Sequence, residues 1–187
     1  MSDERSGEDE VGAETTDQTP ENDGQRFDRL PATAAERVVA GRPTREEVVE
    51  WWEQRYGVPP ETWDGHTFWE KGNGKIWAFA ADVPSPSPVE GLGLRILRAR
   101  QEHWKPSTNA VQRFCGEATE NVVVLDGEEA ERFVRGEDQE LERWDGDWGY
   151  LVAAHEFEGA TEPIGVGLYL HGELRSTVPK GRQEDLS

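Results

Sequence analysis

Residues 148–178 read WGYLVAAHEFEGATEPIGVGLYLHGELRSTV. The β-branched and aromatic runs in this stretch, separated by turn residues, predict three consecutive strands at 148–157, 163–170 and 173–178. The pair His171-Gly172 lies between the last two strands and suits a type I′ hairpin turn. We therefore expect the C-terminal part of the chain to be built on a sheet.

The residues before this stretch predict further strands with two short helices among them. Apolar and polar residues alternate over 92–100 well enough to predict a strand, and the apolar run at 122–125 predicts a buried strand. A helix is expected over 106–116, and another begins at Asp126, whose capping partner is Glu129. This mixture predicts an α+β fold, in the form of a small mixed barrel.

A separate helix and hairpin are expected further upstream. Residues 44–47 form a capping box, and the apolar residues that follow at helical spacing predict a helix that ends at Gly57. Strands at 66–71 and 75–81 are joined by Gly72-Asn73-Gly74, which is a hairpin signal. The tryptophans of this region (51, 52, 63, 69 and 77) are expected to build its core.

Composition predicts three parts along the chain. Residues 1–24 hold nine acids and one base, and we expect a disordered acidic tail over 1–43. Residues 44–82 form the helix and hairpin module. The stiff, proline-rich run at 83–88 then marks a boundary, so that the last domain covers 83–187.

The charge and the cysteine content exclude several classes of protein. The chain has 187 residues with a net charge of −19, and no apolar run is long enough to span a membrane. The acidic first 25 residues do not resemble a signal peptide, and a single cysteine cannot form an internal disulfide. We expect a cytoplasmic protein. Abundant acids with only four lysines are typical of a halophilic protein, whose acidic surface is screened in molar salt. The alternative is a mesophilic protein that is merely acidic.

The motifs of catalysis are absent from the sequence. There is no phosphate-binding loop and no hydrolase nucleophile elbow, and the four histidines lie far apart in the sequence. We therefore expect no catalytic residues, no metal and no cofactor. Cys115 follows an apolar residue near a predicted helix end, and it is expected to be a small buried residue.

The basic residues are concentrated in two segments. Residues 92–116 contain five bases against one acid, and residues 171–182 contain three bases against one acid. Phosphate is the natural ligand for such clusters of Arg and Lys. The alternative is that these side chains pair with neighbouring acids on a solvated face.

Several runs in residues 44–182 resemble the C-terminal region of the Sun/Fmu family of ribosomal-RNA cytosine-5 methyltransferases. The similar runs are Arg55–Pro59, Trp63–Gly65, Gly93–Arg98, Lys105–Ser107, Phe133–Glu137, Gly149–Val152, Pro163–Gly167, Gly172–Leu174 and Pro179–Arg182. In that family the region is a PUA-like RNA-binding domain attached to a catalytic domain. The catalytic domain has no counterpart in this sequence, so the resemblance implies a stand-alone RNA-binding module.

The resemblance and the charge map together give a set of candidate RNA contacts. By analogy with PUA-like domains, RNA lies against the first helix of the barrel, a neighbouring strand and the last segment. Trp104 could stack on an exposed base or simply pack. The full set is Arg95, Arg98, Arg100, Trp104, Lys105, Ser107, Arg113, Arg175, Lys180 and Arg182.

Three functions compete at this point. The first is an RNA-binding module for structured ribosomal or transfer RNA in ribosome biogenesis or RNA modification. The second is a protein–protein adaptor or an accessory subunit of a separate RNA methyltransferase, for which an acidic tail is suited. The third is an enzyme for a small nucleotide, which we rank low because no nucleophile–base pair is visible.

Overall fold

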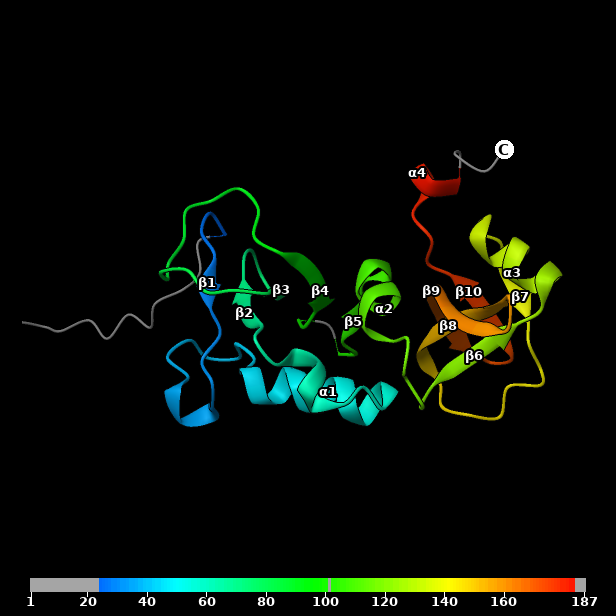
Figure 1. Cartoon of the computed structure of the whole chain (residues 1–187), viewed down its shortest axis with the longest axis horizontal. Coiled ribbons are helices and arrows are strands. Elements are labelled where there is room, and N and C mark those ends of the chain that lie inside the picture. The colour runs from blue at the N-terminus through cyan, green and yellow to red at the C-terminus, as the bar shows by residue number, and fades with distance from the viewer. Residues whose placement is uncertain (1–23, 101, 184–187) are drawn as a thin grey trace, which may run out of the picture.

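The computed structural model describes residues 24–100 and 102–183. Its fold is mixed α+β, with two five-stranded sheets and few helices, and the second sheet curls into a half-barrel (Figure 1). The strands are β1 (Asp28–Arg29), β2 (Thr67–Glu70), β3 (Lys75–Phe79), β4 (Leu94–Arg98), β5 (Lys105–Pro106), β6 (Val122–Leu125), β7 (Gln139–Glu140), β8 (Gly149–Phe157), β9 (Ala160–Leu170) and β10 (Glu173–Ser176). The helical segments are η1 (Ala34–Glu36), α1 (Arg45–Tyr56), η2 (Pro60–Trp63), α2 (Thr108–Phe114), α3 (Gly127–Val134) and α4 (Lys180–Gln183).

Local sequence signals define the helix ends as expected. The hydroxyl of Thr44 accepts a hydrogen bond from the Glu47 amide, and the Glu47 carboxylate accepts one from the Thr44 amide. Asp126 and Glu129 form the same capping box at the start of α3. Gly57 ends α1 in the left-handed conformation, with a φ of 64°. These ends are confirmed because each depends on residues within one turn of the helix.

The first sheet has the order β1-β2-β3-β4-β5 and is antiparallel throughout. The expected boundary at residue 83 does not coincide with the division between the sheets, because β3 pairs directly with β4 across the proline-rich segment. The chain leaves the first sheet only after β5, and α2 leads into the second sheet. Residues 83–88 are therefore part of a loop within one sheet.

The prediction of a disordered tail reaching residue 43 is wrong for residues 24–43. The strand β1 pairs with β2, and Phe27 exchanges two backbone hydrogen bonds of 2.8 Å with Ser87. Phe27 is fully buried against Trp69 and Leu92. Residues 24–43 are ordered because one aromatic residue is buried and a short strand is paired, although the average composition of the segment is polar. The rest of the predicted tail, residues 1–23, lies outside the described residues.

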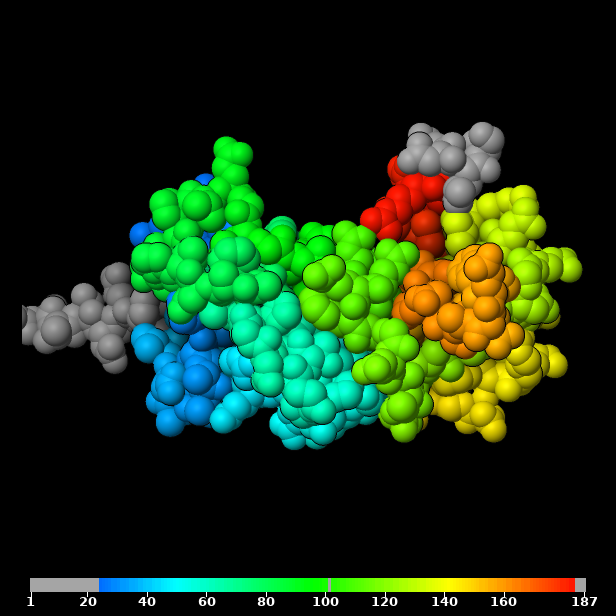
Figure 2. All heavy atoms as spheres, viewed as in Figure 1, coloured from blue at the N-terminus to red at the C-terminus, as the bar shows by residue number. Residues whose placement is uncertain are grey.

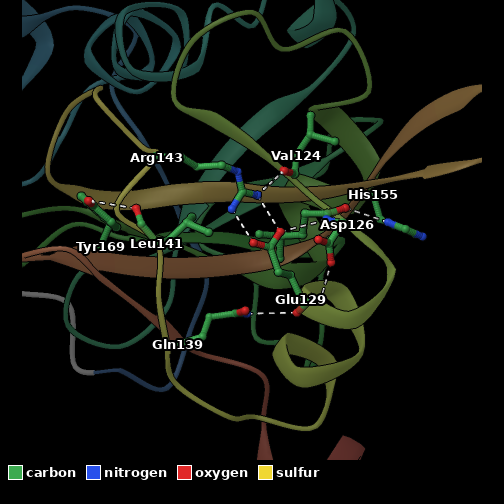
Figure 3. Close-up of polar contacts among 9 residues, drawn as sticks. Val124, Asp126, Glu129, Gln139, Leu141, Arg143, His155 and Tyr169 are labelled. Atoms are coloured by element: carbon green, nitrogen blue, oxygen red, sulfur yellow. Dashed lines mark hydrogen bonds and ion pairs between the residues drawn. The ribbon is translucent and has the colours of Figure 1, made fainter.

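The second sheet has the order β6-β8-β9-β10-β7, in which β6 runs parallel to β8 and the other pairs are antiparallel. His171 and Gly172 join β9 to β10 with φ of 51° and 87°, which fits the predicted type I′ turn. Arg143 anchors the loop after β7 (Figure 3). It donates to the carbonyl of Val124 at 3.0 Å and to the Glu129 carboxylate at 2.6 Å.

One apolar core joins the two sheets. The tryptophans at 52 and 63 are fully buried in it, together with Ile96 of the first sheet and Val152 and Val166 of the second. Helices α1 and α2 supply the packing between the sheets. A second core lies between α3 and the second sheet, around Phe133. The predicted tryptophan core is confirmed for positions 52, 63 and 69, while Trp51 and Trp77 are half-buried.

Within residues 24–100 and 102–183, no helix is long and apolar enough to cross a membrane.

Candidate anion-binding site

A groove of about 240 Å³ lies between the first sheet and the C-terminal segment. Figure 2 shows the hollow beside the red segment that leads to α4. Its walls come from β4, β5, the start of α2 and the chain after β10, which are brought together by the packing of α2 against β4 and β9. The lining residues are Arg95, Leu97, Arg98, Lys105, Pro106, Ser107, Thr108, Asn109, Thr177, Pro179 and Arg182.

A β-bulge directs two arginines of β4 to the same side of the sheet. Residues three apart in a regular strand point to opposite faces. The pairing of β4 with β3 shifts by one residue, so that Leu97 pairs with Ile76 while Arg95 pairs with Trp77. The extra residue, Ile96, is buried, and Arg95 and Arg98 both line the groove. The bulge therefore creates a pair of cations that the spacing alone does not predict.

The basic side chains of the groove make no ion pair with any carboxylate among residues 24–100 and 102–183. This holds for Arg95, Arg98, Lys105 and Arg182. Eight described arginines outside the groove do form such pairs, whereas Arg26, Arg45, Arg100 and Arg113 do not; the eight are Arg29, Arg37, Arg42, Arg55, Arg132, Arg135, Arg143 and Arg175. In a chain with about twice as many acids as bases, the absence of such pairs from four neighbouring cations counts against the solvated-face alternative at the groove.

Like charges are held close to one another at this site. Lys75 lies directly opposite Arg98 in the β3–β4 pair, an arrangement that is unfavourable in a sheet. The pKa of Lys105 is lowered, first by burial and then by the positive charge of Arg98. The Lys105 ammonium lies 5.5 Å from the centroid of the Tyr150 ring, on the start of β8. A bound anion would relieve this repulsion, so the electrostatics favour a negatively charged ligand.

Some polar groups of the groove are engaged within the protein. The Ser107 hydroxyl donates to the carbonyl of Arg95 at 2.6 Å and accepts from the Ala110 amide, so Ser107 acts as the cap of α2. The expected role of Ser107 as a phosphate ligand would require this hydroxyl to change partner. Arg182 donates to the side-chain oxygen of Asn109 at 2.5 Å, which fixes the C-terminal segment against α2.

The structure brings together five of the ten predicted contact residues, which are Arg95, Arg98, Lys105, Ser107 and Arg182. The other five do not line the groove. Arg175 pairs with the Glu173 carboxylate at 2.7 Å, so the solvated-face alternative holds at that position. Arg100 lies against the turn at Gly74, and the guanidinium of Arg113 lies 5.8 Å from the Phe114 ring centroid. Lys180 is exposed on α4.

Trp104 packs against the main core and also lines a second cleft beside the groove. The sequence left two roles open for Trp104, packing in the core or contact with a ligand, and its position in the structure is compatible with both. The structure adds Asn109 and Thr177 to the groove and Trp148 and Tyr150 to the cleft. The polar run after Lys105 was a signal for Asn109, whereas no local signal points to Thr177.

Cys115 is buried, and burial raises the pKa of its thiol to about 12. The expectation of a small buried residue is confirmed. No group of three His, Cys, Asp or Glu side chains suited to a metal ion occurs in the described part of the chain.

Residues 15–93 match the model of a family of unknown function, DUF7122. The match begins in the predicted tail, passes the expected boundary at residue 83, and ends before Arg95 of the groove. It thus covers α1 and β1 to β3 but none of the lining residues. A comparison with curated proteins gives no match.

Proposed function

We propose that this protein is an RNA-binding module that holds the phosphates of a structured RNA in the groove. The observation that carries the proposal is the convergence of four cations on one open groove, with no carboxylate partner among the described residues. These four are Arg95, Arg98, Lys105 and Arg182. Arg and Lys are the side chains that engage phosphates, and phosphate contacts supply much of the affinity for nucleic acids.

The resemblance to the Sun/Fmu C-terminal region gives the proposal its biological setting. We place the module in ribosome biogenesis or RNA modification, bound to ribosomal or transfer RNA, without a catalytic domain of its own. The curled second sheet with α2 beside it is the element that we propose to be of PUA-like type. The proposed site uses parts of α2, of a neighbouring strand and of the last segment, as the resemblance implies.

The acidic surface sets the conditions under which binding is expected. With a net charge of −19, the chain repels RNA at long range in dilute salt. In molar potassium chloride the Debye length is only about 3 Å, so contacts within the groove decide affinity. We therefore propose a halophilic, cytoplasmic protein that binds RNA in concentrated salt.

A charge-reversal pair tests the proposal. We expect Arg98→Glu with Lys105→Glu to weaken the binding of an RNA hairpin with a single-stranded extension at least tenfold in molar potassium chloride. The matched control is Arg113→Glu with Lys180→Glu, which changes the net charge equally at exposed residues outside the groove. We expect the control pair to bind nearly as well as the unchanged protein.

The results separate the competing functions. If both double variants lost the same amount of RNA affinity, only the overall charge would matter, and the groove would be overturned as the binding site. Absence of RNA binding by the unchanged protein would favour the alternative, a protein–protein adaptor or accessory subunit of an RNA methyltransferase. Circular dichroism spectra of both variants verify that the fold is retained.

A further inference from the structure

A second cleft, of about 310 Å³, lies next to the groove. Its walls come from α1, from the residues preceding β5 and from the start of β8, so it lies where α1, the β4–β5 loop and the second sheet meet. The lining residues are Trp51, Arg55, Glu102, His103, Trp104, Trp148, Gly149 and Tyr150. Its volume is at the lower end of the range for small-molecule sites, and four of its eight lining residues are aromatic.

The aromatic walls of this cleft are held in place by their neighbours. The rings of Trp51 and Trp104 lie 5.8 Å apart at an angle of 42°. Trp52 and Tyr56 contact Trp51 edge-on at 5.2 Å and 5.6 Å, so its orientation is fixed from the core side. The inner wall of the cleft is therefore formed by rings that already pack against the core.

Trp148 forms the outer wall and remains 58% exposed. His171 contacts its ring edge-on, with the ring centroids 4.6 Å apart. Arg55 fixes the backbone on either side of Gly149, because it donates to the carbonyls of Trp148 and Tyr150 at 3.0 Å each. A large, exposed apolar ring beside a cleft is a feature of surfaces that bind a partner.

Lys105 connects the cleft with the groove. Its side chain lines the groove, and its ammonium lies over Tyr150, which lines the cleft. Trp104, the preceding residue, lines the cleft as well. Arg55 is paired with Asp147 and the Glu102 carboxylate also lines the cleft, so the opposite charges of its lining largely balance, and Lys105 adds a positive charge on the side of the groove. A neutral, flat, aromatic ligand attached to a phosphate fits both the rings and the charges.

We propose that the cleft receives one unpaired nucleobase of an RNA strand whose phosphates lie in the groove. This inference rests on the proposed function, because the groove must bind the same strand. Bases stack on aromatic side chains with little dependence on sequence. Glu102 and His103 at the cleft supply hydrogen-bonding groups for the edge of the base. The site accordingly prefers RNA that has a single-stranded segment beside its helix.

The first experiment uses an RNA hairpin with a single-stranded extension that carries 2-aminopurine, whose fluorescence falls on stacking. The unchanged protein is expected to quench it at one position of the extension. We expect Trp148→Ala to abolish that quenching and to weaken binding about fivefold or more, which corresponds to the lower end of the range for one stacked base. The matched control is Phe157→Ala, which removes a similarly exposed ring (52%) that does not line the cleft.

A second measurement needs no variant. Replacing the quenched position with an abasic nucleotide keeps every phosphate and removes only the base. The unchanged protein should bind this RNA as weakly as Trp148→Ala binds the intact RNA. Trp148→Phe is expected to retain most of the affinity, since it keeps an aromatic face.

The outcomes distinguish this inference from the proposed function. One outcome overturns the nucleobase site and retains the groove. In it, the double variant Arg98→Glu with Lys105→Glu loses RNA binding, while Trp148→Ala binds the intact RNA, and the unchanged protein binds the abasic RNA, with undiminished affinity. If the unchanged protein binds neither RNA, both proposals are overturned. A loss of affinity in Phe157→Ala equal to that in Trp148→Ala would also contradict the cleft as the site.

Discussion

The ammonium of Lys105 lies 5.5 Å from the centre of the Tyr150 ring. The two residues belong to different sheets, since Lys105 is in β5 and Tyr150 is in β8. Their contact lies where the basic groove meets the aromatic cleft. A ligand that occupies both would have to combine negative charge with flat aromatic groups, as a nucleotide does.

Lys105 should contribute to binding at some expense of stability. Burial and the charge of Arg98 lower its pKa, so the charged form is less favourable in the folded protein than in the unfolded chain. We expect Lys105→Met to unfold at the same or a slightly higher temperature, while its affinity for RNA decreases. Thermal unfolding followed by circular dichroism, with a parallel RNA titration, measures both effects. A clear drop in melting temperature would contradict the electrostatic account of this side chain.

Gly93 is required by the backbone at the entry to β4. Its φ is +62°, and a Cβ atom at this position would lie 2.0 Å from the carbonyl oxygen of Ala78. We expect Gly93→Ala to lower the free energy of unfolding by about 2 kcal/mol or more. Gly91→Ala is the matched control, because no atom lies within 4 Å of its Cβ position and no positive φ is required. Denaturant unfolding of the two variants should differ clearly, and equal stabilities would count against the described strand entry.

The segment before α1 should be part of the folded unit. Phe27 is fully buried against Trp69 and Leu92, so Phe27→Ala should destabilise the protein by about 3–5 kcal/mol. Val38, which is 67% exposed, provides the control, since Val38→Ala removes apolar atoms without opening a cavity. Denaturant unfolding curves of the two variants give the free energies of unfolding to be compared. A Phe27→Ala variant as stable as Val38→Ala would restore the prediction of a disordered segment up to residue 43.

The helix ends, both capping boxes and the hairpins follow from residues close together in the sequence, and these features were predicted. The role of Phe27 was not, because its partners Trp69 and Leu92 lie far along the chain. The β-bulge at Ile96 depends on the pairing with β3, so the shared direction of Arg95 and Arg98 could not be predicted from their spacing. The charge map found the basic segments, but it did not separate Arg182 in the groove from Arg175, which pairs with Glu173.

The protein should become less stable in alkali, with Cys115 responsible for the first part of the loss. Burial raises the pKa of its thiol from 9.0 to about 12, and burial also raises the pKa of Tyr56 above its ordinary 10.0. Each group binds more protons in the folded state than in the unfolded state, so its contribution is intact below the unfolded pKa and is lost as pH rises toward the folded value. The slope is at most about 1.4 kcal/mol per pH unit for each proton.

The variant Cys115→Ala isolates the thiol. Between pH 9 and pH 10, where the Tyr56 contribution is still small, the free energy of unfolding should fall more steeply in the unchanged protein than in the variant. Urea titrations at a series of pH values measure the two slopes. Identical slopes would show that the thiol ionises equally well in both states, in conflict with its burial.

The salt dependence of RNA binding tests the central claim most directly. If Arg95, Arg98, Lys105 and Arg182 each engage one phosphate, the four contacts should contribute a slope of about −3 to the dependence of the logarithm of the binding constant on the logarithm of potassium chloride concentration, beside the opposite contribution from screening of the acidic surface. The neutral pair Arg98→Gln with Lys105→Gln should reduce the magnitude of that slope by about 1.4, because two phosphate contacts are removed. The pair Arg113→Gln with Lys180→Gln should leave the slope unchanged. A slope that is the same in all three proteins would contradict the assignment of the groove as the RNA site.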